Sequence, residues 1–380
     1  MSGAPIPLAR PDVGGREEEL VQEVMRSGRL SLGPMLERFE RDFAEWLGCE
    51  GAVAVSSGTA ALHLGVRALG WKRGDEVVTT PFSFVASANC LLYEGVQPVF
   101  CDIDPVTLNV NPQAVEAACG SRTVGLLPVH IFGYPADMEA LGRIAAPRGL
   151  GVLEDACEAL GAADAEGFKV GTRGNPAAFA FYANKQLTTG EGGMLTAGDG
   201  GVRAQVRSER NQGRGEDMDW LGHHRLGFNY RLSDVAAAIG VAQLERVDEL
   251  LSTRDRAAAM YAERLSGIEG LALPCPDAGK ARRSWFVYVV QLPPEVDRDA
   301  AIASLAAEGI ASKAYLPCIH LQPFYRERFG FRGGEFPVAE QVAARSLALP
   351  FFTSITEEQV DRVCAGLRAL VSRGIPTSTL

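Results

Sequence analysis

The sequence predicts an α/β fold, with a mostly parallel central sheet covered by helices and a smaller C-terminal α+β domain. Short apolar runs alternate with helical patterns, and the runs are apolar on both faces, which is typical of parallel strands buried between helices. The chain has 380 residues, enough for one large domain and one smaller domain. The pattern also changes character beyond residue 265.

The N-terminal part begins with two predicted helices, 15–28 and 35–48. In the second, Phe39 and Phe43 belong to an apolar series at three- and four-residue spacing, the period of one helix face. Strand and helix patterns then alternate as strand 52–57, helix 58–70, strand 76–81, helix 83–95, strand 97–103, apolar run 123–133, helix 136–149, strand 151–156 and strand 177–182.

A long helical pattern follows, from Ser233 as N-cap to Gly267 as the stop. It is long for a globular helix, and we interpret it as joining two domains, 1–250 and 251–380. The predicted elements of the second domain are strand 284–292, helix 297–309, strand 310–317 and a final helix that starts at Thr356, where Gln359 completes a capping box.

The charge and cysteine content narrow the class of protein. The formal net charge is -10, which argues against nucleic acid or an anionic membrane surface as the partner. The eight cysteines form no CxxC pair, so we expect buried reduced thiols and no metal site. The start shows no signal-peptide pattern, and no apolar stretch approaches the roughly 18 residues of a membrane span. We expect a cytoplasmic protein with no membrane partner.

The first motif, SSGTAALHLG at 56–65, places small residues between a strand and a helix. Free amides at the helix start, together with the Ser57 and Thr59 hydroxyls and the turn at Gly58, would suit a phosphate. The alternative is a capped helix start with no ligand.

The second motif, GVLEDACEALGA at 151–162, puts Asp155 at the carboxyl end of a buried strand, where open parallel sheets bind ligands. A carboxylate there needs a cationic or proton-sharing partner. A protonated pyridine nitrogen, a metal ion or an arginine would serve. The alternative is that Asp155 caps the next helix.

The third motif is FYANKQLTTGEGG, residues 181–193, which follows an apolar strand. Apolar surroundings destabilise an ammonium, so Lys185 would offer a free amine for imine formation. The glycines after it permit close backbone approach to a ligand. The alternative is a strand-end lysine that reaches to solvent.

Together the three motifs supply a phosphate cradle, a carboxylate for a pyridine nitrogen and a lysine for a Schiff base. These are the three holds that pyridoxal 5'-phosphate (PLP) requires. They follow three strands of one predicted sheet. In TTPFSFVAS (79–87), Phe84 or Phe82 could stack on the cofactor ring, although each could equally be part of the core.

Further stretches carry a resemblance that extends over nearly the whole chain. With the motifs above, they are PVHIFGYPADM (128–138), GFNYRLSDVAAAIGVAQLE (227–245), IHLQPFY (319–325) and LPFF (349–352). The sequence resembles the DegT/DnrJ/EryC1/StrS family of PLP-dependent sugar aminotransferases, within fold type I. The pairing of EDACEALGA with KQLTTGEGG is the most specific part of this resemblance.

The resemblance implies roles for particular residues. Lys185 would form the Schiff base with PLP, Asp155 would pair with the pyridine nitrogen, and Phe84 would stack on the ring. The remaining cofactor contacts implied are Ser57, Gly58, Thr59, Glu158, Asn184 and Asn229, with the role of Glu158 left open. Asn229 would reach the phosphate from a neighbouring subunit, which implies a homodimer with shared active sites.

One position departs from the family pattern. Relatives have a phosphate-binding serine five residues before the lysine, and this chain has Ala180 there. Asn184, Ser57 or a backbone amide could compensate. By the same resemblance, the substrate residues would be Arg29, Lys313, Tyr315 and His320. His130 would either lie near the cofactor or make a structural hydrogen bond.

The function implied is conversion of a nucleotide-diphosphate keto sugar to an amino sugar, with L-glutamate as amino donor. The alternatives are a dehydratase or another PLP reaction on the same scaffold, or a PLP-binding regulatory protein without catalysis. Relatives that dehydrate carry histidine instead of the lysine, so Lys185 favours transamination. The sequence does not identify the sugar, the nucleotide or the position of the keto group.

Overall fold

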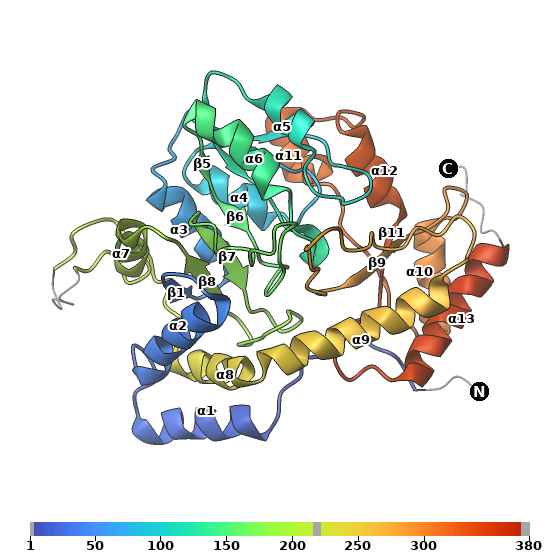
Figure 1. Ribbon diagram of the computed structural model, residues 1–380, viewed down its shortest axis with the longest axis horizontal. Helices are drawn as coiled ribbons and strands as arrows, with labels where there is room; N and C mark the ends of the chain where they lie inside the picture. Colours follow the sequence, from blue (N-terminus) through green and yellow to red (C-terminus); the bar gives the residue numbers. More distant parts are fainter. Residues whose placement is uncertain (1–3, 216–221, 374–380) are drawn as a thin grey trace.

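The computed structural model describes residues 4–215 and 222–373. Helices surround a central sheet in the left and upper part of Figure 1, and a second group of strands and helices lies on the right, near both termini. Helix α9 (Val247–Leu265) runs between the two parts. The predicted class, α/β with a smaller C-terminal unit, is confirmed.

Eight strands form the central sheet: β1 (Ala52–Val55), β2 (Glu76–Thr79), β3 (Gln97–Phe100), β4 (Thr123–Leu127), β5 (Gly151–Val152), β6 (Glu154–Asp155), β7 (Ala177–Ala180) and β8 (Gly193–Thr196). Their order is β3-β2-β4-β5 in one half and β6-β7-β8-β1 in the other. A parallel bridge from Val129 to Asp155 joins the halves. Only β8, which we did not predict, runs antiparallel to its neighbours in this sheet.

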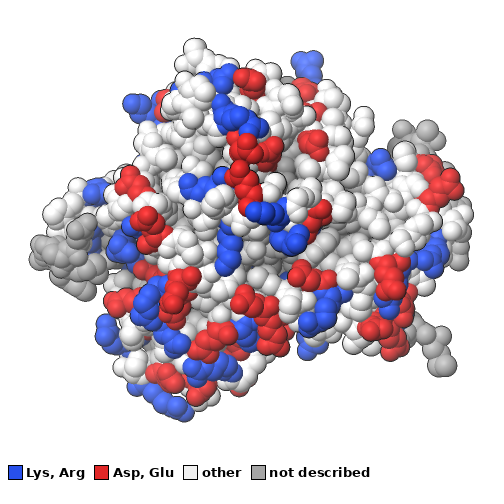
Figure 2. Space-filling model, viewed as in Figure 1, with Lys and Arg blue, Asp and Glu red and all other residues white. Residues whose placement is uncertain are grey.

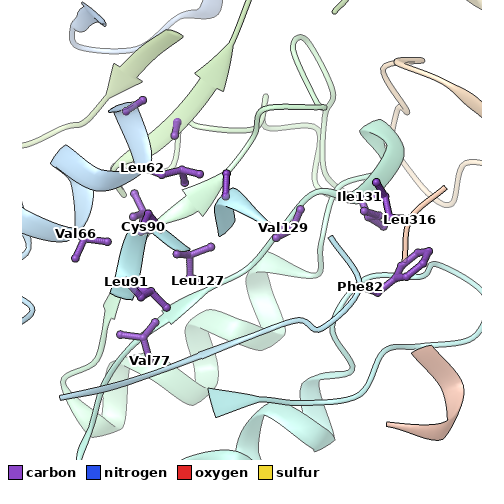
Figure 3. Close-up of a cluster of buried hydrophobic side chains, with 14 of the residues drawn as sticks. Leu62, Val66, Val77, Phe82, Cys90, Leu91, Leu127, Val129, Ile131 and Leu316 are labelled. Carbon is purple, nitrogen blue, oxygen red and sulfur yellow. The ribbon is translucent and has the colours of Figure 1, made fainter. Parts of the chain in front are cut away.

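Helices cover both faces of the sheet because its side chains alternate. Val53 and Val55 belong to the cluster under α3 (Gly58–Ala68) and α4 (Ala86–Tyr93), part of which Figure 3 shows. Ala52 and Ala54 point to the opposite face, which is covered by α1 (Gly15–Ser27), α2 (Pro34–Leu47) and α8 (Asp234–Glu245). The other helices of this part are α5 (Pro112–Ala118), α6 (Met138–Ala145) and α7 (Gly200–Glu209).

The C-terminal unit is built on an antiparallel sheet of order β10-β11-β9, with β9 (Tyr288–Gln291), β10 (Lys313–Ala314) and β11 (Ser346–Leu349). Its helices are α10 (Arg298–Ala307), α11 (Pro323–Phe329), α12 (Pro337–Arg345) and α13 (Glu357–Arg373). The predicted capping box is confirmed: Thr356 N–H donates to Gln359 Oε1 at 3.0 Å, and Gln359 N–H donates to Thr356 Oγ1 at 3.2 Å.

The single long helix predicted from Ser233 is wrong in one respect. Ser233 does cap it, accepting from Ala236 N–H at 3.2 Å, but α8 and α9 are separated at Arg246, whose backbone is not helical. The Arg246 side chain bonds Asp12 and Glu17 on the N-terminal segment. Arg246 therefore bonds the N-terminal segment at the point where α8 ends and α9 begins.

The predicted division into 1–250 and 251–380 stays a prediction. Helix α9 crosses that boundary, and Ile6 forms a bridge with Ile310, so the segment around Ile6 packs on the C-terminal unit. All eight cysteines are free. Acidic and basic side chains alternate over the face shown in Figure 2. Among the described residues, none of the helices combines the length and apolarity needed to cross a membrane.

Candidate active site

The carboxyl ends of the parallel strands open into a cavity of about 320 Å³, within the range of small-molecule sites. All three predicted motifs contribute to it. Its lining includes Ser57, Gly58, Thr59, Ser83, Phe84, Ser87, Asp155, Cys157, Glu158, Ala180, Tyr182, Asn184, Lys185, Glu191, Phe286 and Tyr315. The strand–helix alternation thus places residues more than 100 positions apart in one pocket.

Helix α3 begins at this cavity. Ser57 caps the helix, since its Oγ accepts from Ala60 N–H at 3.1 Å. A Cβ on Gly58 would lie 2.6 Å from the Ala180 Cβ and 2.9 Å from the Cys157 Sγ, so only glycine lets the helix start approach the end of β7. The predicted cap is therefore present, and the first helical N–H groups, which have no intrahelical acceptor, face a cavity that can hold an anion.

Asp155 is buried at the end of β6 with each carboxylate oxygen already bonded once. Oδ2 accepts from Ser87 Oγ at 2.7 Å, and Oδ1 accepts from Cys157 N–H at 3.1 Å. The Ser83 hydroxyl lies 2.7 Å from that of Ser87 and extends the chain of hydrogen bonds. Asp155 does not cap a helix, because turns follow it. That alternative is wrong.

Lys185 lies in the turn after β7, where its N–H donates to Tyr182 O at 2.9 Å. Its side chain is 13% exposed and lines the cavity, so it does not reach out to bulk solvent. Nζ lies 4.0 Å from Glu158 Oε1 and 3.9 Å from the ring centroid of Phe286. A carboxylate and an aromatic ring therefore both contact the amine.

Glu158 is held in a fixed direction. Its Oε2 accepts from the Phe132 N–H at 2.9 Å, which leaves Oε1 toward Lys185. Burial raises the pKa of the Glu158 carboxyl, and the charge of Lys185 and the Phe132 N–H oppose that rise. The carboxyl can hold or release a proton beside the amine.

Phe84 and Phe82 have different environments. Phe84 is 61% exposed and lines the cavity, as a ring available to stack on a ligand would be. Phe82 is fully buried, and it points to Ile131 and Leu316 in Figure 3. Phe82 is therefore a core residue, and Phe84 is the candidate for ring stacking.

The other cofactor candidates divide into two groups. Asn184 lines the cavity, and its buried Oδ1 has no partner among the described residues. Ala180 lines it too, with a methyl group where a hydroxyl was expected. Asn229 is exposed and is not part of the cavity lining in this single chain.

The predicted substrate residues do not all meet at the site. Tyr315 lines the cavity, and Lys313 lines a second cavity beside it. Arg29 is exposed and donates to Leu32 O. The structure does not bring His320 to either cavity: it is fully buried, and its Nε2 lies 3.0 Å from Glu340 Oε1. His130 is also buried, and its Nδ1 accepts from Ala136 N–H. Of its two predicted roles, this is the structural hydrogen bond.

Sequence reasoning missed two residues that contact the central groups. Ser87 donates to Asp155, and its place in TTPFSFVAS, four residues after Ser83, was the available signal. Phe286 lies under Lys185, but it is about 100 residues further along the chain, just before β9. No local pattern could have indicated that contact.

The residues present fit PLP. A buried carboxylate with spare acceptor capacity suits a protonated ring nitrogen, the start of α3 suits a phosphate, and Lys185 suits the aldehyde carbon. The exposed Phe84 ring and the unpartnered Asn184 Oδ1 are further groups that a ligand would cover. The expected phosphate-binding serine is replaced by Ala180, which would leave the phosphate with one hydrogen-bond donor fewer.

Comparison with known proteins identifies the family of this chain. The DegT/DnrJ/EryC1/StrS aminotransferase family matches residues 11–368. GDP-perosamine synthase of Caulobacter vibrioides is 37% identical over 371 residues, which cover 97% of this chain and 99% of that protein.

Two of the similar solved structures show the same fold over 98% of this chain. DesV of S. venezuelae, in complex with a ketimine intermediate, has a TM-score of 0.92 and 33% identity, covering 98% of this chain and 100% of its own. The synthase of 3-amino-5-hydroxybenzoic acid has a TM-score of 0.91 and 28% identity, with the same coverage of both chains.

Proposed function

Because this chain belongs to the DegT/DnrJ/EryC1/StrS family of PLP-dependent sugar aminotransferases, we propose that it aminates a keto sugar linked to a nucleoside diphosphate, with L-glutamate as the amino donor. The observation that carries the proposal is the meeting of Lys185, Asp155 and the start of α3 in one cavity. The product would serve polysaccharide or glycoconjugate biosynthesis.

The chain's own residues would divide the work as follows. PLP, when bound, supplies the electron sink that makes the α-hydrogen of an attached amine acidic. Asp155 would pair with the ring nitrogen, the α3 N–H groups with the phosphate, and Phe84 with one ring face. Lys185 would hold the cofactor covalently at rest and, once freed, take the proton from the donor α-carbon at its Nζ.

The neighbouring cavity supports a large substrate. It measures about 960 Å³ and shares Ser83, Phe84 and Tyr315 with the cofactor cavity. Among the described residues, its lining includes Lys313 and Arg328 but no carboxylate, and cations of this kind bind phosphate oxygens well. A sugar attached to a diphosphate could therefore place its keto carbon near Lys185 and its phosphates in the second cavity.

Asn229 supports a homodimer with shared active sites. It is exposed and lies outside the cavity of its own chain, which is compatible with a contact to the partner's phosphate. We expect a cytoplasmic enzyme, since its proposed substrates are soluble metabolites. Size measurement in solution, and PLP binding by Asn229→Ala, would test this part.

Another PLP reaction is the competing function. The likeness to 3-amino-5-hydroxybenzoic acid synthase favours it, whereas Lys185 disfavours the dehydration carried out by relatives with histidine. The test is incubation of the holoenzyme with L-glutamate and a panel of UDP-, GDP- and dTDP-linked keto sugars. We expect an amino sugar nucleotide and 2-oxoglutarate in equal amounts; dehydrated sugar, or no turnover with any member, contradicts the proposal.

A further inference from the structure

Arg254, on α9, is an arginine buried without a close acidic partner. Its exposed fraction is 4%, and arginine is almost never buried unless paired. Burial lowers the pKa of its guanidinium to about 10, so it still carries its charge near neutral pH. Among the described residues, Asp12 alone opposes that shift, and Asp12 is itself paired with Arg246 at 2.9 Å.

The guanidinium donates to main-chain carbonyls instead of to a carboxylate. Its Nη2 bonds Lys185 O at 3.2 Å, and its Nη1 bonds Trp285 O at 3.4 Å and Phe286 O at 3.2 Å. Nε has no partner among the described residues. The contacts therefore join two segments 100 residues apart in sequence.

These two segments are the ones that meet at the reactive amine. The Phe286 ring centroid lies 3.9 Å from Lys185 Nζ. One side chain thus holds the carbonyl of the lysine and the carbonyl of the residue whose ring contacts that lysine. Because the Lys185 N–H is also bonded, to Tyr182 O, both polar ends of the lysine backbone are fixed.

We propose that Arg254 is a positioning residue for the reaction: it fixes the main chain of Lys185 relative to Phe286, so that Nζ meets the cofactor and the substrate α-carbon at one angle. This inference rests on the proposed role of Lys185, and not on the identity of the sugar. A buried cation with no ion pair lowers the stability of a fold. A role in positioning the Lys185 main chain would give a functional reason for keeping Arg254 despite this loss of stability. A displacement of about 1 Å can reduce a rate by about 10²-fold.

The test compares Arg254→Met and Arg254→Lys with two controls. Arg256→Met makes the same change two residues along α9, at an exposed side chain that bonds Thr253 and does not line the cavity. Leu305→Ala opens a cavity in a C-terminal core cluster to which Lys185 does not belong, and serves as a destabilised control. Each variant is loaded with PLP and measured for borohydride labelling of Lys185, visible circular dichroism of the bound cofactor, the rate of the amino-donor half-reaction and its apparent KM, and Tm.

We expect Arg254→Met to weaken the visible dichroism and to slow the half-reaction by about 10²-fold. Arg254→Lys should slow it by about tenfold. In both variants the apparent KM should change less than about threefold. Lysine retains the charge but cannot reach both segments. If Arg254→Met does not fold, Arg254→Lys decides. The inference is overturned if Arg254→Lys keeps wild-type dichroism and rate within twofold, or if Leu305→Ala, at an equal loss of Tm, loses as much. Absence of borohydride label on wild-type Lys185 would instead contradict the proposed function.

Discussion

The cofactor cavity has a floor and a wall that are built differently. The floor is formed by lining residues at or just after the ends of strands of the central sheet: Ser57, Gly58, Thr59, Asp155, Cys157, Glu158, Ala180, Asn184 and Lys185. The wall consists of Phe286 and Tyr315, aromatic residues of the C-terminal part. Floor residues lie in compact motifs, whereas wall residues have no motif of their own and reach the site through packing.

The difference between floor and wall separates the residues that supply chemical groups from those that shape the cavity. Floor groups are defined by charge and hydrogen bonding, as in the pair of bonds to Asp155. Wall residues contribute shape and exclude water: Tyr315 lies 5.8 Å from Phe132 and 6.3 Å from Phe286 between ring centroids. We therefore expect changes in the floor to alter the chemistry most, and changes at its margin to alter it less.

The largest effect is expected at Lys185. Replacement by alanine removes the amine that holds the cofactor and moves the proton, so turnover should fall by about 10⁴-fold or more. The absorbance of the Schiff base should disappear, which spectroscopy of the PLP-loaded protein measures. Lys169→Ala is the control, because that lysine bonds Trp46 O outside the cavity. Normal transamination by Lys185→Ala would contradict the assignment.

Asp155 should come second. Asp155→Asn keeps the shape but removes the negative charge facing the ring nitrogen, and we expect kcat to fall by about 10²-fold. Glu154→Gln is a matched control on the same strand. Glu154 is buried as well, but it accepts from Gly171 N–H and does not line the cavity. If both variants lose the same activity, the loss cannot be assigned to the position of Asp155 in the floor of the cavity.

Glu158, also a floor residue, should show its effect as a dependence of stability on pH. Its pKa is raised in the folded chain, so the folded state binds more protons than the unfolded state between the ordinary value and the raised one. The free energy of unfolding should therefore fall as pH rises from about 4.5 through the raised pKa. Glu158→Gln should flatten this dependence in urea unfolding of the apoprotein at several pH values. An unchanged slope would show that the carboxyl is not buried as described.

The smallest effect is expected from restoring the hydroxyl missing at Ala180. Ala180→Ser adds one hydrogen-bond donor beside the start of α3, and one such bond stabilises by about 0.5–1.5 kcal/mol. We expect PLP to bind the apoprotein about fivefold more tightly, measured by fluorescence titration. Ala183→Ser, in the same turn but outside the cavity lining, should leave the affinity unchanged. Weaker binding by Ala180→Ser would place the phosphate elsewhere.

Particular residues show how far sequence reasoning extended. It identified Lys185, Asp155 and the start of α3, because each belongs to a short motif at the end of a strand. From the residues alone it left Phe82 and Phe84 open, since both lie in one run, and the resemblance favoured Phe84; burial separates the two. It placed His320 near the substrate, whereas its ring is enclosed by Phe331 and Phe336. It also extended one helix through Arg246, which bonds to residues 12 and 17.

The sequence by itself determined the fold class and the family and indicated the candidate reactive groups of the floor, because hydrophobic periodicity and compact motifs are local properties of the chain. The tertiary structure decided which distant residues meet those groups. Phe286 under the amine, Ser87 on Asp155 and Arg254 on the carbonyl of Lys185 all depend on contacts between separate elements. Such contacts follow from how elements pack. Ser87 had a local signal in TTPFSFVAS, but no local pattern indicated the contacts of Phe286 and Arg254.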